Sequence, residues 1–160
     1  MSTTEQPRWL TPEERDGWVA LAGALITVPA ALDAQMQRDA QLSYFEYMVL
    51  SWLSMEPERT ARMSDLAELV HGSLSRLSHV ARRLEKQGLL SRRPDPADGR
   101  YTLATLTERG WDKVVAAAPG HVEAVHRIVL DPLTKTQVKQ LRDIGTRLQQ
   151  AADEASHLPD

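Results

Sequence analysis

Hydrophobic residues recur at steps of three and four along most of this chain, the spacing that places them on one face of an α-helix. The clearest case lies within residues 74–86, where the apolar stripe consists of Leu74, Leu77, Val80, Ala81 and Leu84. Comparable stripes predict helices over about 12–39, 44–55, 64–70, 108–130 (interrupted near Pro119 and Gly120) and 135–155. Strand-like runs near 89–93 and 101–106 flank a charged loop, so the pattern predicts a mainly α protein with one small β-hairpin.

Residues that cap helices stand at the expected helix starts. Three sequences have the Ser/Thr-x-x-Glu/Gln spacing of a capping box, in which the two end residues exchange side-chain and backbone hydrogen bonds: Thr11–Glu14, Ser43–Glu46 and Thr134–Gln137. Ser73 and Thr107 are placed to cap the helices that follow them, and Gly88 to end the helix over 74–86. We therefore expect a single domain over residues 1–160, with a unit at 43–106 between flanking helices at 12–39 and 108–155.

The helix predicted over 74–86 carries a basic face opposite its apolar stripe. That face consists of cations and short hydrogen-bonding groups: Ser75, Arg76, His79, Arg82, Arg83 and Lys86. Such a helix is suited to a DNA major groove, where its first turns contact base edges and later residues contact phosphates. The Ser73 cap, with the Ser75 hydroxyl, is suited to a phosphate. With the hairpin as a wing that reaches the next groove, residues 43–106 predict a winged helix-turn-helix.

The charge distribution supports this interpretation although the net charge of −3 does not. Residues 72–100 contain seven Lys and Arg against three Asp and Glu, whereas the rest of the chain contains twelve against nineteen. Positive charge concentrated on one segment of an acidic protein is typical of a phosphate-facing patch. A solvated helix face that binds nothing would give the same count, so charge alone leaves both interpretations open.

Composition excludes several other classes of protein. The absence of cysteine excludes disulfides, thiolate metal sites and cysteine nucleophiles. The first residues lack the order of a signal peptide, and no apolar run is expected to reach the length of a membrane span, so we expect a cytoplasmic protein with no membrane partner.

Few residues suggest a metal, a cofactor or catalysis. His121 and His126 are five residues apart, about 140° around a helix, and no nearby acid completes a metal site. Ser78 and His79 are adjacent and lack an acid to orient the histidine, and the chain has no Gly-rich phosphate loop or nucleophile elbow. We expect no cofactor and no enzymatic activity.

The flanking helices indicate a dimer. Their apolar stripes are long, and the compact unit at 43–106 offers little surface to cover them. Packing against the same helices of a second subunit is the simplest way to bury them. A bundle formed within one subunit is the alternative.

Residues 75–110 carry the motifs of a known family. RLEK followed by GLL lies within 83–90, DGR at 98–100, and LTERG at 106–110. In this order and at this spacing the chain resembles the MarR family of bacterial transcription regulators over nearly its whole length. The resemblance implies a triangular homodimer with interdigitated terminal helices, bound to a pseudo-palindromic operator in double-stranded DNA.

The resemblance also assigns roles to residues of the wing. It implies that Asp98 braces the wing tip and that Arg100 contacts the minor groove, where a narrow groove attracts the guanidinium. Gly99 stands where a second arginine is common in the family, while the arginine at the end of the motif is present as Arg100. Arg82, Arg83, Arg92 and Arg93 are expected to contact phosphates or to brace the wing. The full set of expected DNA-binding residues is Ser73, Ser75, Arg76, His79, Arg82, Arg83, Arg92, Arg93, Asp98 and Arg100.

Members of the family often bind a small, frequently aromatic and anionic effector between the dimer helices and the winged lobe. Four aromatic residues are candidates for such a pocket, although simple core packing is the commoner role of such residues: Trp18, Tyr47, Trp52 and Trp111. The resulting hypothesis is a homodimeric repressor released from DNA by a small ligand. Its alternatives are a constitutive architectural DNA binder without an effector and a winged-helix module that binds proteins. The sequence names neither the operator nor the regulated genes, and it does not decide between repression and activation.

Overall fold

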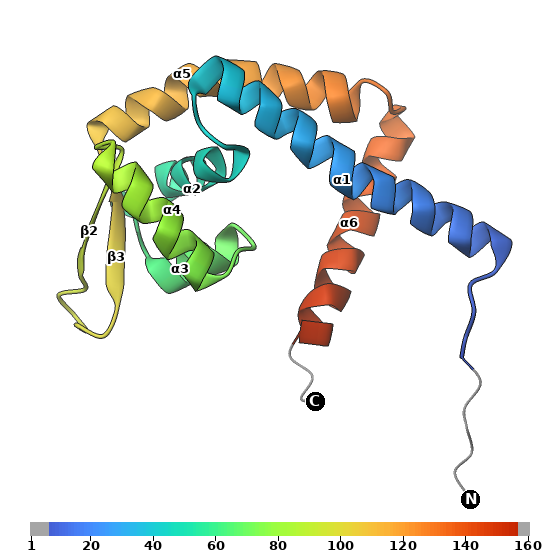
Figure 1. Cartoon of the computed structure of the whole chain (residues 1–160), viewed down its shortest axis with the longest axis horizontal. Helices are drawn as coiled ribbons and strands as arrows, with labels where there is room; N and C mark the ends of the chain where they lie inside the picture. Colours follow the sequence, from blue (N-terminus) through green and yellow to red (C-terminus); the bar gives the residue numbers. More distant parts are fainter. Residues whose placement is uncertain (1–6, 157–160) are drawn as a thin grey trace, which may run out of the picture.

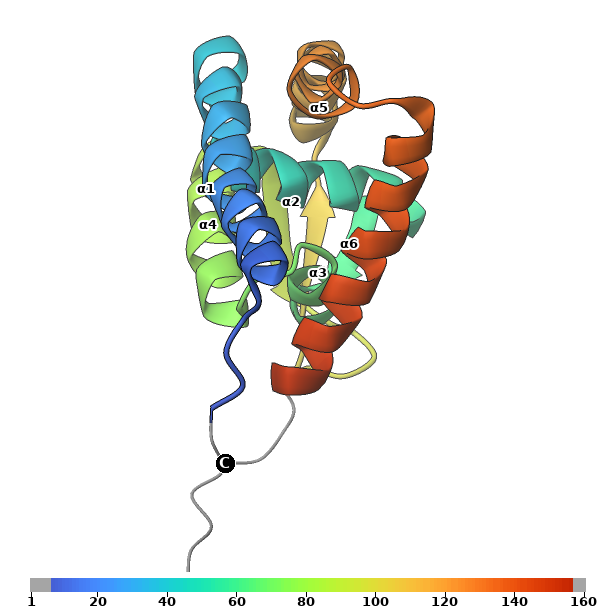
Figure 2. The ribbon, with the colours of Figure 1, turned by 90° about the vertical axis from the view of Figure 1, so that its right-hand side faces the viewer.

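Two long helices form the upper frame of the molecule. In the computed structural model, which describes residues 7–156, α1 (Pro12–Ala40) and α5 (Glu108–Val125) pack against each other above a smaller lobe (Figure 1). A five-residue π-helix (His126–Leu130) follows α5, and α6 (Lys135–Ser156) then runs down from the frame. In the view turned by 90° about the vertical axis, α1 and α6 descend on separate sides (Figure 2).

The lobe beneath this frame combines three helices with a small antiparallel sheet. Its elements are α2 (Tyr44–Met55), a 3-10 turn (Pro57–Arg59), β1 (Thr60–Arg62), α3 (Met63–Leu69), α4 (Leu74–Lys86), β2 (Leu90–Pro94) and β3 (Thr102–Leu106). The strands lie in the order β1-β3-β2, so Ala104 of β3 pairs with Ala61 on one side and Arg92 on the other. The prediction of a mainly α fold with a β-hairpin wing is confirmed.

The three predicted capping boxes all form. In the first, the Thr11 hydroxyl accepts from the Glu14 N–H at 3.2 Å, and the Thr11 N–H donates to the Glu14 carboxylate at 2.8 Å. The same exchange joins Ser43 to Glu46 and Thr134 to Gln137. Each cap satisfies N–H groups that lack an intrahelical partner, so these short sequences fix where α1, α2 and α6 begin.

The lobe is built around one apolar core. It includes inward residues of α2, α3, α4 and β3: Val49, Leu50, Leu53, Leu66, Leu77, Ala81, Leu84 and Ala104. These side chains are fully buried. Of the apolar stripe predicted for α4, Leu74 is the exception, because it lies in the first turn and is 50% exposed. The core therefore fixes which face of α4 points outward.

Close contacts connect α4, β2 and α5 at one seam. Gly88 ends α4 at a φ of +70°, a left-handed conformation that glycine adopts without strain. The Thr107 hydroxyl donates to the Gly88 carbonyl at 2.7 Å, and the Thr107 N–H donates to the Leu89 carbonyl at 3.2 Å. Gly110 of α5 lies against the same Leu89 carbonyl, where a Cβ atom would clash. The start of α5 is thus fixed to the end of α4.

Three expectations about the elements are wrong. Strand β1 was not predicted, because its three residues form a strand only by pairing with β3, more than forty residues away. Helix α5 is continuous through Pro119, and the irregularity comes instead at residues 126–130. Pro119 lies on the exposed side of α5, where water can replace the hydrogen bond that proline cannot donate.

The third correction concerns α1, which is long and apolar enough by length and composition to cross a membrane. Residues 17–34 contain a single charged side chain, Asp33, although glycine, alanine and threonine separate the larger apolar residues. The expectation that no apolar run reaches this length is therefore wrong. Length and composition alone are weak evidence for a span, because apolar helices of non-membrane assemblies meet the same criteria.

Candidate nucleic-acid interface

Helix α4 presents a polar face to solvent along its whole length. The Ser73 hydroxyl accepts from the Arg76 N–H at 3.1 Å and caps the helix. Leu77, Val80, Ala81 and Leu84 are buried, which turns the opposite side outward. The exposed residues of that side include Ser75, Arg76, His79, Arg82 and Lys86. The cationic face expected from the sequence is therefore open to a ligand.

The wing is a hairpin whose loop carries one strongly exposed arginine. Beyond the last strand pair, Pro94 with Thr102, the Asp98 carboxylate accepts from the Arg100 side chain at 2.6 and 3.0 Å and from its backbone N–H at 3.1 Å. These bonds hold the pKa of Asp98 below its ordinary value. The Arg100 side chain remains 83% exposed. Asp98 thus fixes the direction of Arg100 without covering it.

Two of the predicted DNA-binding arginines are engaged within the fold. Arg83 pairs at 2.6 Å with Glu46, whose side chain is only 4% exposed, and so joins α4 to α2. Arg92 of β2 pairs with Glu85 of α4, which accepts at 2.8 Å from the guanidinium and at 3.0 Å from the Arg92 N–H. Donation by Arg92 lowers the pKa of Glu85. Both arginines support the position of the recognition elements.

Other cations are available to a ligand. Within residues 7–156, neither Arg82 nor Arg93 pairs with an acid, and both side chains are exposed. A hollow of about 230 Å³ on the outer side of α4 is lined by His79, Arg82, Arg83 and Lys86. A concave surface lined only by such groups is suited to an anion such as a phosphate.

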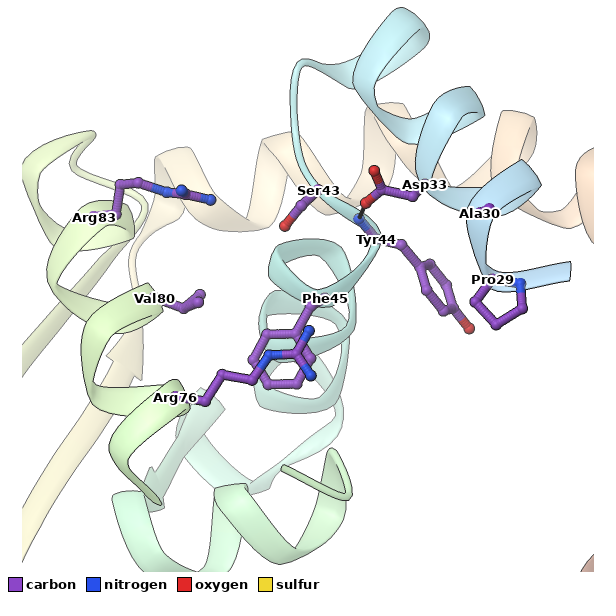
Figure 3. Close-up of a pocket in the computed structure, with 9 residues that line it drawn as sticks. All are labelled: Pro29, Ala30, Asp33, Ser43, Tyr44, Phe45, Arg76, Val80 and Arg83. Atoms are coloured by element: carbon purple, nitrogen blue, oxygen red, sulfur yellow. Dashed lines mark hydrogen bonds between the residues drawn. The ribbon is translucent and has the colours of Figure 1, made fainter. Parts of the chain in front are cut away.

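Arg76 lies at the edge of a larger hollow between α1, α2 and α4 (Figure 3). Its guanidinium lies flat over the Phe45 ring, 4.0 Å from the ring centre. Pro29, Tyr44 and Asp33 lie on the far side, where Asp33 accepts from the Tyr44 N–H at 2.8 Å. The hollow measures about 640 Å³. The side chain expected to read bases is therefore stacked on an aromatic ring beside an open cavity.

The four aromatic residues expected near an effector lie in different surroundings. Trp18 is exposed on α1, and Tyr47 is buried against His121. Trp52 lines a separate hollow with Leu69 and acidic residues, and Trp111 lies under the guanidinium of Arg59 at 4.0 Å. None of the four lines the hollow beside Arg76.

The histidines considered for a metal also differ in their contacts. The His121 ring packs between Tyr44 and Tyr47, with ring centres 5.7 and 4.8 Å away. His126 faces solvent, with its Nδ1 atom 3.7 Å from Asp131. The two histidines therefore contact different residues and do not face each other across a common site.

Sequence reasoning missed one pair that supports the wing. Arg62 of β1 donates to Asp95, whose side chain is only 8% exposed, and the shortest distance between the two groups is 2.7 Å. The Asp-Pro at residues 95–96 marks a turn. Nothing local indicates that the partner lies thirty-three residues earlier, because β1 itself was not predicted.

A helix with an open cationic face, followed by a hairpin with an exposed arginine, defines a winged-helix DNA-binding protein. Comparison with known proteins agrees. Residues 42–102 match the MarR family. The chain is 39% identical to Sco3205, a MarR family transcriptional regulator from Streptomyces coelicolor solved in complex with DNA. The structures agree with a TM-score of 0.88 over 92% of each chain.

Two curated relatives come from Bacillus subtilis (strain 168), and both are uncharacterized HTH-type transcriptional regulators. YxaD is 31% identical over 110 residues, which cover 69% of this chain and 74% of YxaD. YdcH is 40% identical over 60 residues, which cover 38% of this chain and 41% of YdcH. The chain belongs to the MarR family of DNA-binding transcription regulators, a family of regulators and not of enzymes.

Proposed function

We propose that this protein is a cytoplasmic homodimeric repressor that binds a pseudo-palindromic DNA operator and is released from it by a small ligand. One observation carries the DNA-binding part. The outward face of α4 and the wing loop hold exposed cations, whereas the rest of the chain is acidic. Repression is the commoner behaviour in the family.

The exposed residues divide by the part of DNA that they suit. Ser75, Arg76 and His79 lie in the first turns of α4, the part of a recognition helix that contacts base edges. Arg82, Arg93 and the Ser73-capped helix start are suited to phosphates. Arg100, held by Asp98, is suited to the minor groove. Arg83 and Arg92, which are bound to acids within the fold, are assigned to support.

Exposed apolar side chains on the flanking helices support the dimer. On α1 they include Trp18, Val19, Leu25 and Ile26, and on α6 they include Leu141, Ile144 and Leu148. An apolar surface of this extent on a lone subunit is typical of an interface. A second copy of α1 and α6 would cover both stripes, which also accounts for the apolar composition of α1 without a membrane.

The hollow beside Arg76 supports an effector site. Aromatic rings from Tyr44 and Phe45 and the Arg76 guanidinium face this space. Together they suit a small aromatic anion, since the rings offer stacking and the guanidinium offers paired donors. The four aromatic residues expected near an effector lie outside this hollow, and their role in an effector pocket stays a prediction.

Selection of bound duplexes from a random DNA pool tests the proposal, followed by titration of the selected duplex at several salt concentrations. Because each neutralised phosphate releases counterions, log K against log salt should have a slope of about −4 or steeper for a dimer. A slope near zero and no selected sequence would favour the protein-interaction alternative.

One substitution and one ligand titration refine this test. Arg76→Ala should weaken binding to the selected operator by about 1–3 kcal/mol and relax the preference at one base pair per half-site. Adding small aryl carboxylates to the complex should release the DNA. A complex that no such ligand affects would indicate the constitutive architectural binder.

A further inference from the structure

The wing loop extends beyond the part of the hairpin that the sheet holds. The last strand pair joins Pro94 to Thr102, so residues 95–101 have no ladder partner. Within the loop, the Asp95 N–H donates to the Tyr101 carbonyl and the Tyr101 N–H to the Asp98 carbonyl. These bonds close the loop on itself, but they do not set its direction relative to α4.

One side chain from outside the hairpin connects this loop to the body of the lobe. Arg62 is the last residue of β1 and directly precedes α3. Its Nε donates to the Asp95 carboxylate at 2.8 Å, and its terminal nitrogen lies 2.7 Å from the same oxygen. The other Asp95 oxygen accepts from the Ala97 N–H at 2.9 Å, so Asp95 both shapes the turn and receives Arg62.

The Arg62 guanidinium also contacts Tyr101, the residue next to Arg100. Arg62 lies over the Tyr101 ring at 4.4 Å, and the Arg100 guanidinium lies 6.0 Å from the centre of that ring. Tyr101 therefore has contacts with a fixed arginine and with an exposed one. A change at Arg62 reaches Arg100 through Asp95 and through this ring.

We propose that Arg62 is a positioning residue for DNA recognition, which holds the wing loop through Asp95 and Tyr101 in the orientation that presents Arg100 to the minor groove. The inference rests on the proposed function, in which Arg100 reads the minor groove. Without Arg62, the loop would keep its internal turn but would lose its fixed orientation relative to the lobe. DNA binding would then have to fix that orientation. Ordering one long side chain weakens binding by about two- to tenfold.

The test is a double-mutant cycle read out on two DNA duplexes. Both carry the same selected operator, with either A·T-rich or G·C-rich flanks where the wing lies. The proteins are the full-length wild type, Arg62→Met, Arg100→Ala and the double variant, and the measured quantity is the ratio of the two dissociation constants. Methionine keeps the unbranched stem of Arg62 but removes the charge and the donors.

We expect the wild type to prefer A·T-rich flanks, Arg100→Ala to lose that preference, and Arg62→Met to reduce it by about two- to tenfold. The double variant should equal Arg100→Ala, because Arg62 acts only through Arg100. A general loss of stability would instead weaken binding to both duplexes equally and leave the ratio unchanged. Asp95→Asn provides a second variant that keeps the side-chain shape and should reproduce Arg62→Met.

Arg59 offers a matched control. It pairs with Glu108 at 3.0 Å and lies over the Trp111 ring at 4.0 Å, the same kinds of contact that Arg62 makes, but on the α5 side of the sheet. Arg59→Met should leave the flank preference intact. The inference is overturned if Arg62→Met and Asp95→Asn keep the full preference, or if their effects add to that of Arg100→Ala. If Arg100→Ala itself keeps the preference, the proposed role of the wing fails, and this inference fails with it.

Discussion

Two adjacent arginines of α4, Arg82 and Arg83, differ in role because only Arg83 has a buried acidic partner within the part of the chain that the structure describes. Both arginines are exposed, but Arg83 compensates the buried carboxylate of Glu46, whereas Arg82 has no acid partner in the described residues 7–156. Arg83→Met should lower the free energy of unfolding by about 1–3 kcal/mol, since it leaves a buried charge unpaired. Arg82→Met should change stability by less than about 0.5 kcal/mol and yet weaken DNA binding.

Chemical denaturation and DNA titration of the two variants measure these effects. Equal stability of both variants would show that water replaces Arg83 beside Glu46 without cost. Unchanged DNA affinity of Arg82→Met would remove Arg82 from the interface.

The partly buried imidazole of His121 predicts a pH effect on stability. Burial against Tyr44 and Tyr47 of α2 lowers the pKa of His121, so the unfolded chain binds a proton more readily than the folded protein. Stability should therefore decrease as the pH falls through about 6.5, the ordinary pKa of histidine, and level off below the folded pKa. Thermal unfolding of wild type and His121→Phe between pH 5 and 7.5 measures this.

His121→Phe should remove most of the pH dependence of stability between pH 5 and 7.5. The control His126→Gln, which changes an exposed histidine, should retain it. The carboxylates with lowered pKa values, Glu14, Glu85, Asp95 and Asp98, lose their stabilising contribution at lower pH, below about 4.5, and do not interfere with the measurement. A stability that does not change between pH 5 and 7.5 would contradict the assignment.

Individual residue contacts were only partly predictable from the sequence. The caps at Thr11, Ser43 and Ser73 involve neighbours in the chain, and all three formed as expected. The pairs Arg83–Glu46 and Arg62–Asp95 join residues more than thirty positions apart. The pattern placed Arg83 on the polar face of a helix and assigned no role to Arg62, and only the fold determines which acid each one meets.

Among the elements, those with a strong period of their own were predicted well. The bounds of α2 matched, and α4 began after the expected cap. Strand β1 was missed because it consists of three residues that form a strand only against β3. Helix α5 was expected to break at Pro119. Packing against α1 and α2 keeps it helical there, although proline cannot donate a backbone hydrogen bond. Tertiary contacts thus determine the secondary structure of β1, where the local sequence signal is weak, and of α5, where it favours a break.

Helix α6 yields a prediction at this scale. All of its residues lie outside the buried core, and its apolar side chains face solvent in the single subunit. Deletion of residues 133–160 should therefore give an unstable or aggregating protein. Ile144→Glu should raise the dimer dissociation constant at least about 100-fold, because two isoleucine side chains leave the interface.

Sedimentation measures both changes, with Lys139→Glu on another face of α6 as the control. A well-folded monomer after the deletion would show that the interface lies elsewhere.

The whole molecule predicts the spacing of its operator. Two recognition helices related by a two-fold axis enter successive major grooves on one side of DNA when their half-sites are about 10 bp apart. The selected operator should be a near-palindrome with this spacing. Insertion of five base pairs at its centre turns one half-site to the opposite side and should reduce affinity to that of one half-site. A single asymmetric site that is unaffected by the insertion would contradict the dimer.

The seam at Thr107 and Gly110 has a mechanical consequence for such a dimer. Because the start of α5 lies directly on the Leu89 carbonyl and its cap is bonded to the end of α4, the joint between frame and lobe leaves little room for a hinge. Each lobe must then turn together with its α5. In the proposed dimer, the angle between the two α5 helices would then set the distance between the two recognition helices, and rotation within the frame would move both lobes out of register with DNA.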